Sequence, residues 1–376
     1  MSEGLFGGIY ARGDVAGEVA DAAWLRSMLD VEAALARACA REGLIPEGAA
    51  AAIGRACARP ETFDVDAIGR EATQHASPVV PLVAALRDAV GGDAAEHVHH
   101  GATSQDVVDT AAMLVARRAL DPLLRDVAGV CAATARIALE HRATPVQART
   151  LLQAAQTTSF GLKAAGWLQA VCDAGVLLKG VRNRALAVQM GGPVGARGPA
   201  IAGAVAEELG LREPPTAWHT NRVRPVALAS ALGILAGALA KVAGDVALLS
   251  QHEVGEVREG GDSDRGRSSS MSHKRNPVAA VSVIACAERV PGLVATMLAA
   301  MPQEHERAAG RWQGEWGTLT DLLRLTGSAA AWGADLLENV DVDSARMRAN
   351  LIGDEAVPEA VDELIDRALG AYWGTE

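Results

Sequence analysis

Residues 226–240 read "VALASALGILAGALA", and this stretch points most directly to the fold. It is shorter than the roughly 20 apolar residues that a membrane-spanning helix needs, and the charged residues Lys241 and Asp245 follow it. Alanine and leucine are strong helix formers that lose little side-chain freedom in a helix. We therefore expect a helix buried among other helices, and no membrane partner.

The same helical spacing of apolar residues recurs along most of the chain. It predicts an all-α protein with a long central helical bundle, because no alternation of strands and helices is visible. We expect an N-terminal helical domain over 1–105, the bundle over 106–325 and a short C-terminal helical domain over 326–376. Prolines 122 and 291 are expected to kink or interrupt their helices. The expected helices cover residues 15–43, 79–90, 106–143, 158–189, 224–257, 278–301 and 317–339.

Composition limits the possible partners and the compartment. The chain has 376 residues and a net charge of −11, which argues against nucleic acid or an anionic membrane surface as the main partner. A small anionic substrate remains compatible, because a local basic site can lie in an acidic protein. The five cysteines are scattered and form no C-x-x-C pair, and no secretory signal precedes the first helix. We expect reduced thiols and a cytoplasmic protein.

The loop over residues 260–277, which we call the serine loop, contains "RGRSSSMSHKRNP" at 265–277. Asn276 and Pro277 fit the N-cap and first position of a following helix. Lys274 and Arg275 are not needed for that cap, and cations beside a helix N-terminus are unfavourable unless an anion lies between them. The pattern therefore predicts an anion site in which serine hydroxyls and backbone N–H groups stabilise negative charge.

The stretch "HGATSQDVVDT" at 100–110 predicts a second helix start. Thr103 and Asp106 fit a capping box, which alone explains much of the motif. Thr103 and Ser104 at a helix N-terminus could also bind a carboxylate. The nearby histidines 97, 99 and 100 match no metal-ligand spacing, so we predict no metal site there. "RTLLQ" at 149–153 reads as an approach to a helix, and "GGPVGARG" at 191–198 as a turn.

The serine loop and "TSQD" resemble conserved regions of the fumarase/aspartase superfamily. Within it, the chain resembles the bacterial 3-carboxy-cis,cis-muconate lactonizing enzymes over about residues 4–351. Fragments of the chain appear in the family's order, and together they are specific where each alone is not. These fragments are "HGATSQDVVDT", "RTLLQ", "TTSFGLKAAGWL", "WHTNR", "EVGEV", "MSHKRNPVA", "QEHERAAGRWQGEW" and "VDSARMRANL".

Three positions separate this chain from parts of the superfamily. The β-eliminating lyases have a histidine where this chain has Leu152, which favours the cycloisomerases. The family pattern has glycine before the serines and proline after the methionine, whereas this chain has Arg267 and Ser272. Only a short segment follows "MRANL" at 347–351, where the family continues with further helix. The resemblance therefore implies a truncated C-terminal domain.

The resemblance implies a cofactor-independent cycloisomerase that acts on a small tricarboxylate, without metal. It implies that Ser268 is the general base, with Lys274 supplying positive charge. The implied substrate contacts are Thr103, Ser104, Thr150, Gln153, Arg222, Ser269 and Asn276, and possible further participants are His141, His273 and Arg267. The resemblance also implies a homotetramer whose sites combine residues of three subunits.

Two questions stay open from the sequence. Arg267 could bind a substrate carboxylate, or it could pair in solvent with Asp262 or Asp264. The protein could also be a superfamily β-elimination lyase for another substituted succinate, adenylosuccinate-like or nitrosuccinate-like, or a catalytically silent helical oligomer. Lactone formation, fumarate release or neither would separate these alternatives.

Overall fold

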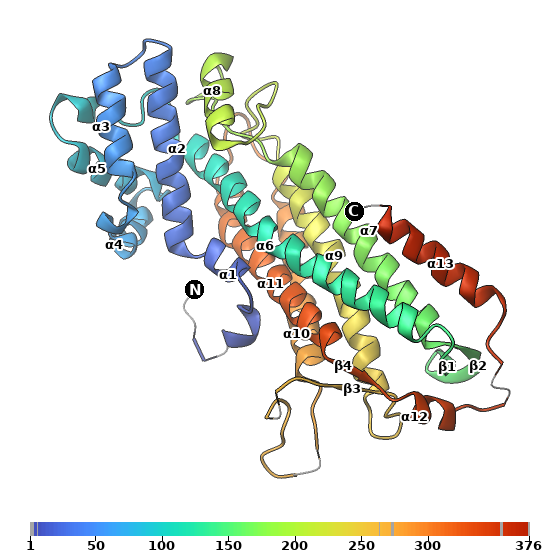
Figure 1. Ribbon diagram of the computed structural model, residues 1–376. Coiled ribbons are helices and arrows are strands. Elements are labelled where there is room, and N and C mark those ends of the chain that lie inside the picture. The colour runs from blue at the N-terminus through green and yellow to red at the C-terminus, as the bar shows by residue number, and fades with distance from the viewer. Residues whose placement is uncertain (1–3, 6, 263, 272–273, 354–355, 375–376) are drawn as a thin grey trace.

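The computed structural model describes residues 4–5, 7–262, 264–271, 274–353 and 356–374. Long helices lie side by side and form a bundle, with short strands at one end of it (Figure 1). The bundle helices are α6 (Ser104–Glu140), α7 (Phe160–Ala185), α9 (Val223–Leu249), α10 (Val278–Ala299) and α11 (Gln313–Glu338). The predicted all-α fold is confirmed.

Helix α9, which contains the apolar stretch at 226–240, packs against α7, α10 and α11. By length and composition alone, α9 and α10 could each span a membrane, and 56% of the most apolar window of α9 is buried in the bundle. The predicted extension of α9 to residue 257 is wrong. Apolar spacing continues beyond Leu249, but the backbone turns through Gly255, whose φ is 62°.

Both prolines that were expected to disturb helices lie inside continuous ones. Pro122 is buried within α6, and Pro291 lies within α10. A proline removes one backbone hydrogen bond and strains its turn, and the packing of these long helices outweighs that local cost. The helix predicted over 158–189 is α7, which ends at Ala185.

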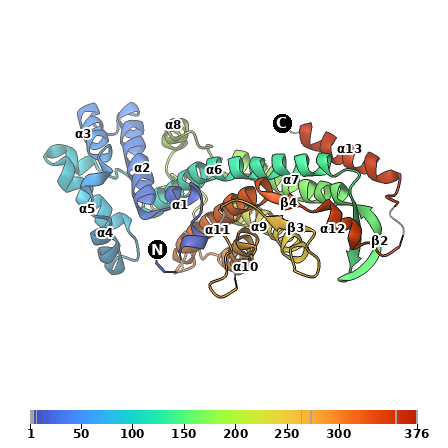
Figure 2. The ribbon, with the colours of Figure 1, turned by 60° about the horizontal axis from the view of Figure 1, so that its bottom comes forward.

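The N-terminal helices form a separate group beside one end of the bundle (Figure 2). The prediction of one helix over 15–43 is wrong, because Ala20 is extended (φ −68°, ψ 159°). The break lets the first segment pack on α6 and α11 while the second packs on α3. The α-helices of this region are α1 (Val15–Glu18), α2 (Asp21–Arg41), α3 (Glu47–Cys57), α4 (Val65–Glu71) and α5 (Val79–Val90). Its 3₁₀-helices are Gly8–Tyr10, Pro60–Thr62, Ala72–Gln74 and Asp93–His97.

Two small pairs of antiparallel strands lie at the opposite end of the bundle (Figures 1 and 2). Strand β1 (Pro145–Thr150) pairs with β2 (Gln153–Ser159), and β3 (Val257–Glu259) pairs with β4 (Val340–Val342). The reading of "RTLLQ" as a helix approach is therefore wrong. Leu151 and Leu152 form the turn of the first hairpin with positive φ angles of 50° and 65°, a conformation that local apolar spacing does not reveal.

The remaining helices are α8 (Pro199–Leu209), α12 (Ser344–Ala349) and α13 (Ala360–Trp373). Helix α13 lies along α7 and is tied to the end of α6 by ion pairs from Arg142 to Asp362 and Asp366. The predicted domain boundary at residue 105 falls at the start of α6. The boundary after residue 325 falls inside α11, so a division there would cut a bundle helix.

Candidate active site

The predicted capping box at the start of α6 is present, and Asp106 extends it into a larger network. Asp106 is fully buried, and its carboxylate accepts the N–H of Thr103 at 3.1 Å. It also accepts the N–H groups of Gly191 and Gly192 at 2.9 and 2.8 Å and lies 2.9 Å from His219 Nε2. One carboxylate thus joins the helix start, the glycine turn at 191–198 and the "WHTNR" segment.

Arg307 is a candidate site residue that the sequence did not indicate. Its Nη1 donates to Thr103 Oγ1 at 3.0 Å, and its Nη2 donates to the carbonyl of Pro193 at 2.9 Å. A guanidinium beside a helix N-terminus opposes the helix dipole. An anion bound between them would be attracted by both. The available signal was an arginine in the family-like fragment "QEHERAAGRW".

Arg222 was expected to bind the substrate, but the structure pairs it internally. It is 3% exposed, and its Nη1 and Nη2 lie 2.7 Å from Asp109 and 2.6 Å from Glu315. Burial opposes its charge, yet the two carboxylates outweigh that effect and raise its pKa. Trp312 also donates to Asp109, at 3.0 Å. This pairing favours a positioning role for Arg222, because its guanidinium is already held between two carboxylates.

The hairpin holds Thr150 and Gln153 at its exposed tip, where they pair with each other across the turn. Next to this tip, Arg149 binds both oxygens of the fully buried Glu256 at 3.0 and 2.8 Å. The Arg149–Glu256 contact therefore holds the hairpin close to its turn and leaves Thr150 and Gln153 exposed.

His141 lies at the C-terminal end of α6, with its Nδ1 3.1 Å from Thr144 Oγ1. Burial lowers the pKa of His141, which favours a neutral ring able to accept a proton. Thr103 lies at the other end of the same helix, whose 37 residues span about 55 Å. His141 and the start of α6 therefore cannot belong to one site within a single chain.

In the serine loop, Ser268 Oγ accepts the N–H groups of Ser270 and Met271 at 3.3 and 3.2 Å. These donors would stabilise a serine alkoxide, the species required of a serine base. The side chains of Ser269 and Lys274 are exposed, and Asn276 is half-buried. His273 and Ser272 lie outside the described residues.

The N-terminus of α10 is not free for a ligand, which corrects the expected cap. Pro277, not Asn276, is the N-cap, and the helix begins at Val278. The carboxylate of Glu259 accepts the N–H groups of Ala279 and Ala280 at 2.9 and 2.8 Å. The anion that balances this helix end is therefore part of the protein.

Arg267 pairs with Asp264 at the solvent-exposed surface, which is one of the two alternatives left open by the sequence. Its Nη1 lies 2.7 Å from Asp264 Oδ1, and both side chains are well exposed. Directly before Arg267, Gly266 takes the left-handed conformation, with φ 72°. Arginine is therefore tolerated at 267 because its neighbour makes the turn.

The predicted site residues lie in three separate places (Figure 1). Thr103 and Ser104 lie at the end of the bundle near α8, whereas Thr150 and Gln153 lie on the hairpin at the other end. Ser268 lies on the serine loop, near β3 and β4. One chain does not bring these three groups together.

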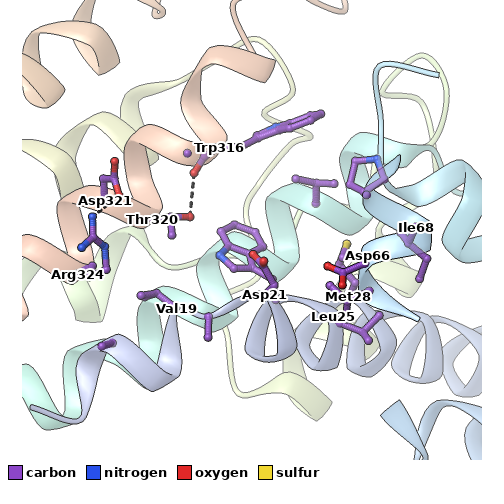
Figure 3. A pocket seen from close by; sticks show the side chains of 18 of the residues that line it. Val19, Asp21, Leu25, Met28, Asp66, Ile68, Trp316, Thr320, Asp321 and Arg324 are labelled. Atoms are coloured by element: carbon purple, nitrogen blue, oxygen red, sulfur yellow. Dashed lines mark hydrogen bonds and ion pairs between the residues drawn. The ribbon is translucent and has the colours of Figure 1, made fainter. Parts of the chain in front are cut away.

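A large cavity of about 970 Å³ lies between α2, α4 and α11. Figure 3 shows Met28, Ile68 and Trp316 lining it from those elements. Within the described residues, none of the predicted site residues lines this cavity. The cavity therefore lies apart from the candidate site residues.

Among the described residues, no group of three or more His, Cys, Asp or Glu side chains is placed to hold a metal ion. His99, in the histidine cluster, instead lies 2.6 Å from the buried carboxylate of Glu32.

A family model described as "Lyase" matches residues 13–292. The chain belongs to this lyase family. Its fold agrees with that placement, because a crystal structure of the 3-carboxy-cis,cis-muconate lactonizing enzyme from Pseudomonas putida superposes with a TM-score of 0.87. The two chains are 37% identical, over 99% of this chain and 88% of that one.

Members of the family that resemble this chain carry more than one activity in their names. A 3-carboxy-cis,cis-muconate cycloisomerase of Bradyrhizobium diazoefficiens is 45% identical over 93% of this chain and 80% of its own length. A nitrosuccinate lyase of Streptomyces davaonensis is 43% identical over 98% of this chain and 82% of its own length. Overall identity therefore does not by itself separate ring closure from elimination.

Proposed function

We propose that this protein is a cycloisomerase that converts 3-carboxy-cis,cis-muconate to carboxymuconolactone in the protocatechuate branch of aromatic catabolism. The similarity to relatives and solved structures named for this substrate carries the proposal. Leu152, where eliminating lyases have an acid–base histidine, favours ring closure over elimination.

The reaction forms one C–O bond and one C–H bond. A substrate carboxylate oxygen attacks an alkene carbon, and the π electrons move toward a second carboxylate, which becomes an aci-carboxylate. A proton is then added to the carbon α to that group. Catalysis therefore needs stabilisation of extra oxyanion charge and one acid–base group.

The residues can be assigned to these tasks. Ser268 exchanges the proton, supported by the backbone N–H groups that its Oγ accepts. Lys274, Ser269 and Asn276 bind the aci-carboxylate. The remaining carboxylates contact Arg307 with Thr103 and Ser104, and Thr150 with Gln153. His141 is a second candidate for proton transfer.

These groups can meet only if copies of the chain share a site, so we propose a cytoplasmic homotetramer with sites shared between subunits. The bundle leaves apolar side chains exposed on helices that a partner bundle could cover. Val281 and Leu298 on α10 are 53% and 50% exposed, and Ile234 on α9 is 51% exposed. Burial of such a surface stabilises association at about 25 cal/mol per Å² of apolar area.

The nitrosuccinate lyase relative keeps one competing function open, namely release of fumarate from a substituted succinate. Purified protein should be mixed with each substrate in parallel. Decay of the diene absorbance with lactone detected by NMR supports the proposal, provided that EDTA does not abolish it. Fumarate release from nitrosuccinate without lactone formation would establish the competing function. Light scattering of the active protein as a monomer would contradict the shared site.

A further inference from the structure

The base of the serine loop is fixed to the C-terminal end of α11. Strand β3 leads into the loop and pairs with β4, which follows α11. Beyond the paired strands, the N–H of Gly260 donates to the carbonyl of Asn339 at 2.8 Å. A Cβ atom at position 260 would lie 2.6 Å from that carbonyl oxygen. Glycine at 260 therefore permits the close approach of the loop to α11.

A second attachment comes from inside the loop. Arg265 Nη2 lies 2.7 Å from Asp335 Oδ2 on α11, and the two side chains are 19% and 17% exposed. The same carboxylate accepts a hydrogen bond from Asn339 Nδ2 at 3.0 Å through its other oxygen. Asp335 is thus oriented by the residue whose carbonyl holds Gly260.

The ion pair of Arg265 differs from that of Arg267, two residues further along. Arg267 and Asp264 are 64% and 76% exposed and lie within one short segment of the loop. Exposed pairs of this kind contribute little, whereas partly buried pairs are less screened by water and salt. Arg265 links the loop to the bundle, so its pair fixes where the loop leaves the protein.

Arg12 provides an internal comparison at the same carboxylate. Its Nη2 lies 3.2 Å from Asp335 Oδ2, and its guanidinium stacks 4.0 Å from the centre of the Trp332 ring. Arg265 approaches the same ring at 6.0 Å. Arg12 belongs to the N-terminal segment, and its contacts within the described part of the chain are with Ser328, Trp332 and Asp335 on α11. Replacing Arg12 therefore tests support of α11, whereas replacing Arg265 tests support of the serine loop.

We infer that Arg265 and Asp335 are positioning residues that hold the Ser268 segment of the serine loop in its reactive place. Gly266 follows Arg265 directly, and its carbonyl accepts the N–H of Asn276 at 2.8 Å. The anchored residue therefore lies at the point where the two sides of the loop meet, three positions before Ser268. The catalytic consequence rests on the proposed function of Ser268.

The test compares Arg265→Ala, Arg265→Lys and Asp335→Asn with Arg12→Ala as the matched control. A displacement of about 1 Å of a reacting group can cost about 100-fold in rate. We expect kcat to fall about 10- to 100-fold in Arg265→Ala and Asp335→Asn, with a smaller change in KM. Arg265→Lys should recover part of the loss, and Arg12→Ala should keep kcat.

Trypsin digestion gives a readout that does not depend on turnover. Cleavage after Arg267 and Arg275 should be faster in Arg265→Ala and Asp335→Asn than in wild type, and unchanged in Arg12→Ala. Equal cleavage in all four proteins, or an equal loss of kcat in Arg12→Ala, would overturn the inference. A wild type without turnover of the muconate refutes the proposed function instead, while digestion still decides whether the loop is anchored.

Discussion

Arg307 Nη1 donates a hydrogen bond to Thr103 Oγ1 over 3.0 Å at the N-terminus of α6. Two elements 204 residues apart in the chain therefore meet where a helix end and a guanidinium both attract an anion. Asp106, which lies beneath Thr103, is saturated by backbone N–H groups and His219. The arrangement leaves the positive charge of Arg307 for a ligand carboxylate.

We expect Arg307→Ala to lower kcat/KM about 10- to 100-fold, because a hydrogen bond to a charged group is worth about 1.5–3 kcal/mol. Arg307→Lys should recover only part of the activity, since an ammonium cannot reproduce two-pronged binding of a carboxylate. Steady-state kinetics on the tricarboxylate measure both. Wild-type kinetics in Arg307→Ala would show that this end of α6 does not bind substrate.

Ser268→Ala should lower turnover by about 10²–10⁴-fold, the usual effect of losing a positioned acid–base group. Ser268 is half-buried, and its Oγ accepts N–H groups from the same loop, so the fold and the assembly should be unchanged. Circular dichroism and light scattering provide the controls. Activity near that of wild type would show that Ser268 is not the acid–base group, and His141 would be the next candidate.

The sequence indicated those parts of the proposed site whose signals are local. Ser268, Lys274 and Thr103 lie in short motifs whose residue types match their proposed tasks. Arg307 and Glu259 were missed because their partners are distant in the sequence, and a single arginine or glutamate carries no sign of such a contact. Arg222 was assigned to the ligand for the same reason, since its buried partners Asp109 and Glu315 are separated from it by about a quarter of the chain.

The same distinction applies to the fold: the sequence indicated features with local causes, and it did not indicate features set by contacts between distant residues. Apolar spacing located the bundle helices, because a buried helix needs a continuous apolar face. It did not locate the break at Ala20 or the turn at Leu151 and Leu152, where packing between distant elements sets the backbone conformation.

Arg222→Met should destabilise the protein by about 3–5 kcal/mol, because it leaves Asp109 and Glu315 buried without their cation. Burial already raises the pKa of Glu315. The matched control is Arg125→Ala, which removes an exposed pair with Asp14 and should cost about 0–1 kcal/mol. Denaturant unfolding compares the two. Equal losses would mean that the buried network adds nothing beyond a surface pair.

The His99–Glu32 pair should make stability depend on pH. Burial opposes the charge on His99, but the Glu32 carboxylate outweighs it and raises the pKa of His99 above its ordinary value of 6.5. The stabilisation is then complete below about pH 6.5 and is lost as the pH rises through the raised folded-state pKa.

His99→Asn is a suitable variant, because asparagine tolerates the positive φ of 64° at this position. The difference in Tm between wild type and this variant should shrink as the pH rises from about 6 to 9. A difference that stays constant over this range would exclude a stabilising charge on His99.

Arg267→Gly should leave both KM and kcat almost unchanged. Arg267 pairs in solvent with Asp264, and its backbone does not adopt a positive φ. Loss of such an exposed pair is worth about 0–1 kcal/mol, which corresponds to less than about a fivefold change. A larger rise in KM with little change in kcat would show that Arg267 binds a substrate carboxylate.

Gly266→Ala is the matched comparison for Arg267→Gly, because glycine is required at 266. Its φ is 72°, and a Cβ there would lie 2.3 Å from the carbonyl oxygen of Asn276. The added methyl group should push apart the two sides of the serine loop, displace Ser268 and lower kcat by about 100-fold. Steady-state kinetics on the two variants distinguish the residue that shapes the loop from the one that replaced a family glycine. Equal kinetics in both variants would mean that the closure between Gly266 and Asn276 does not set the position of Ser268.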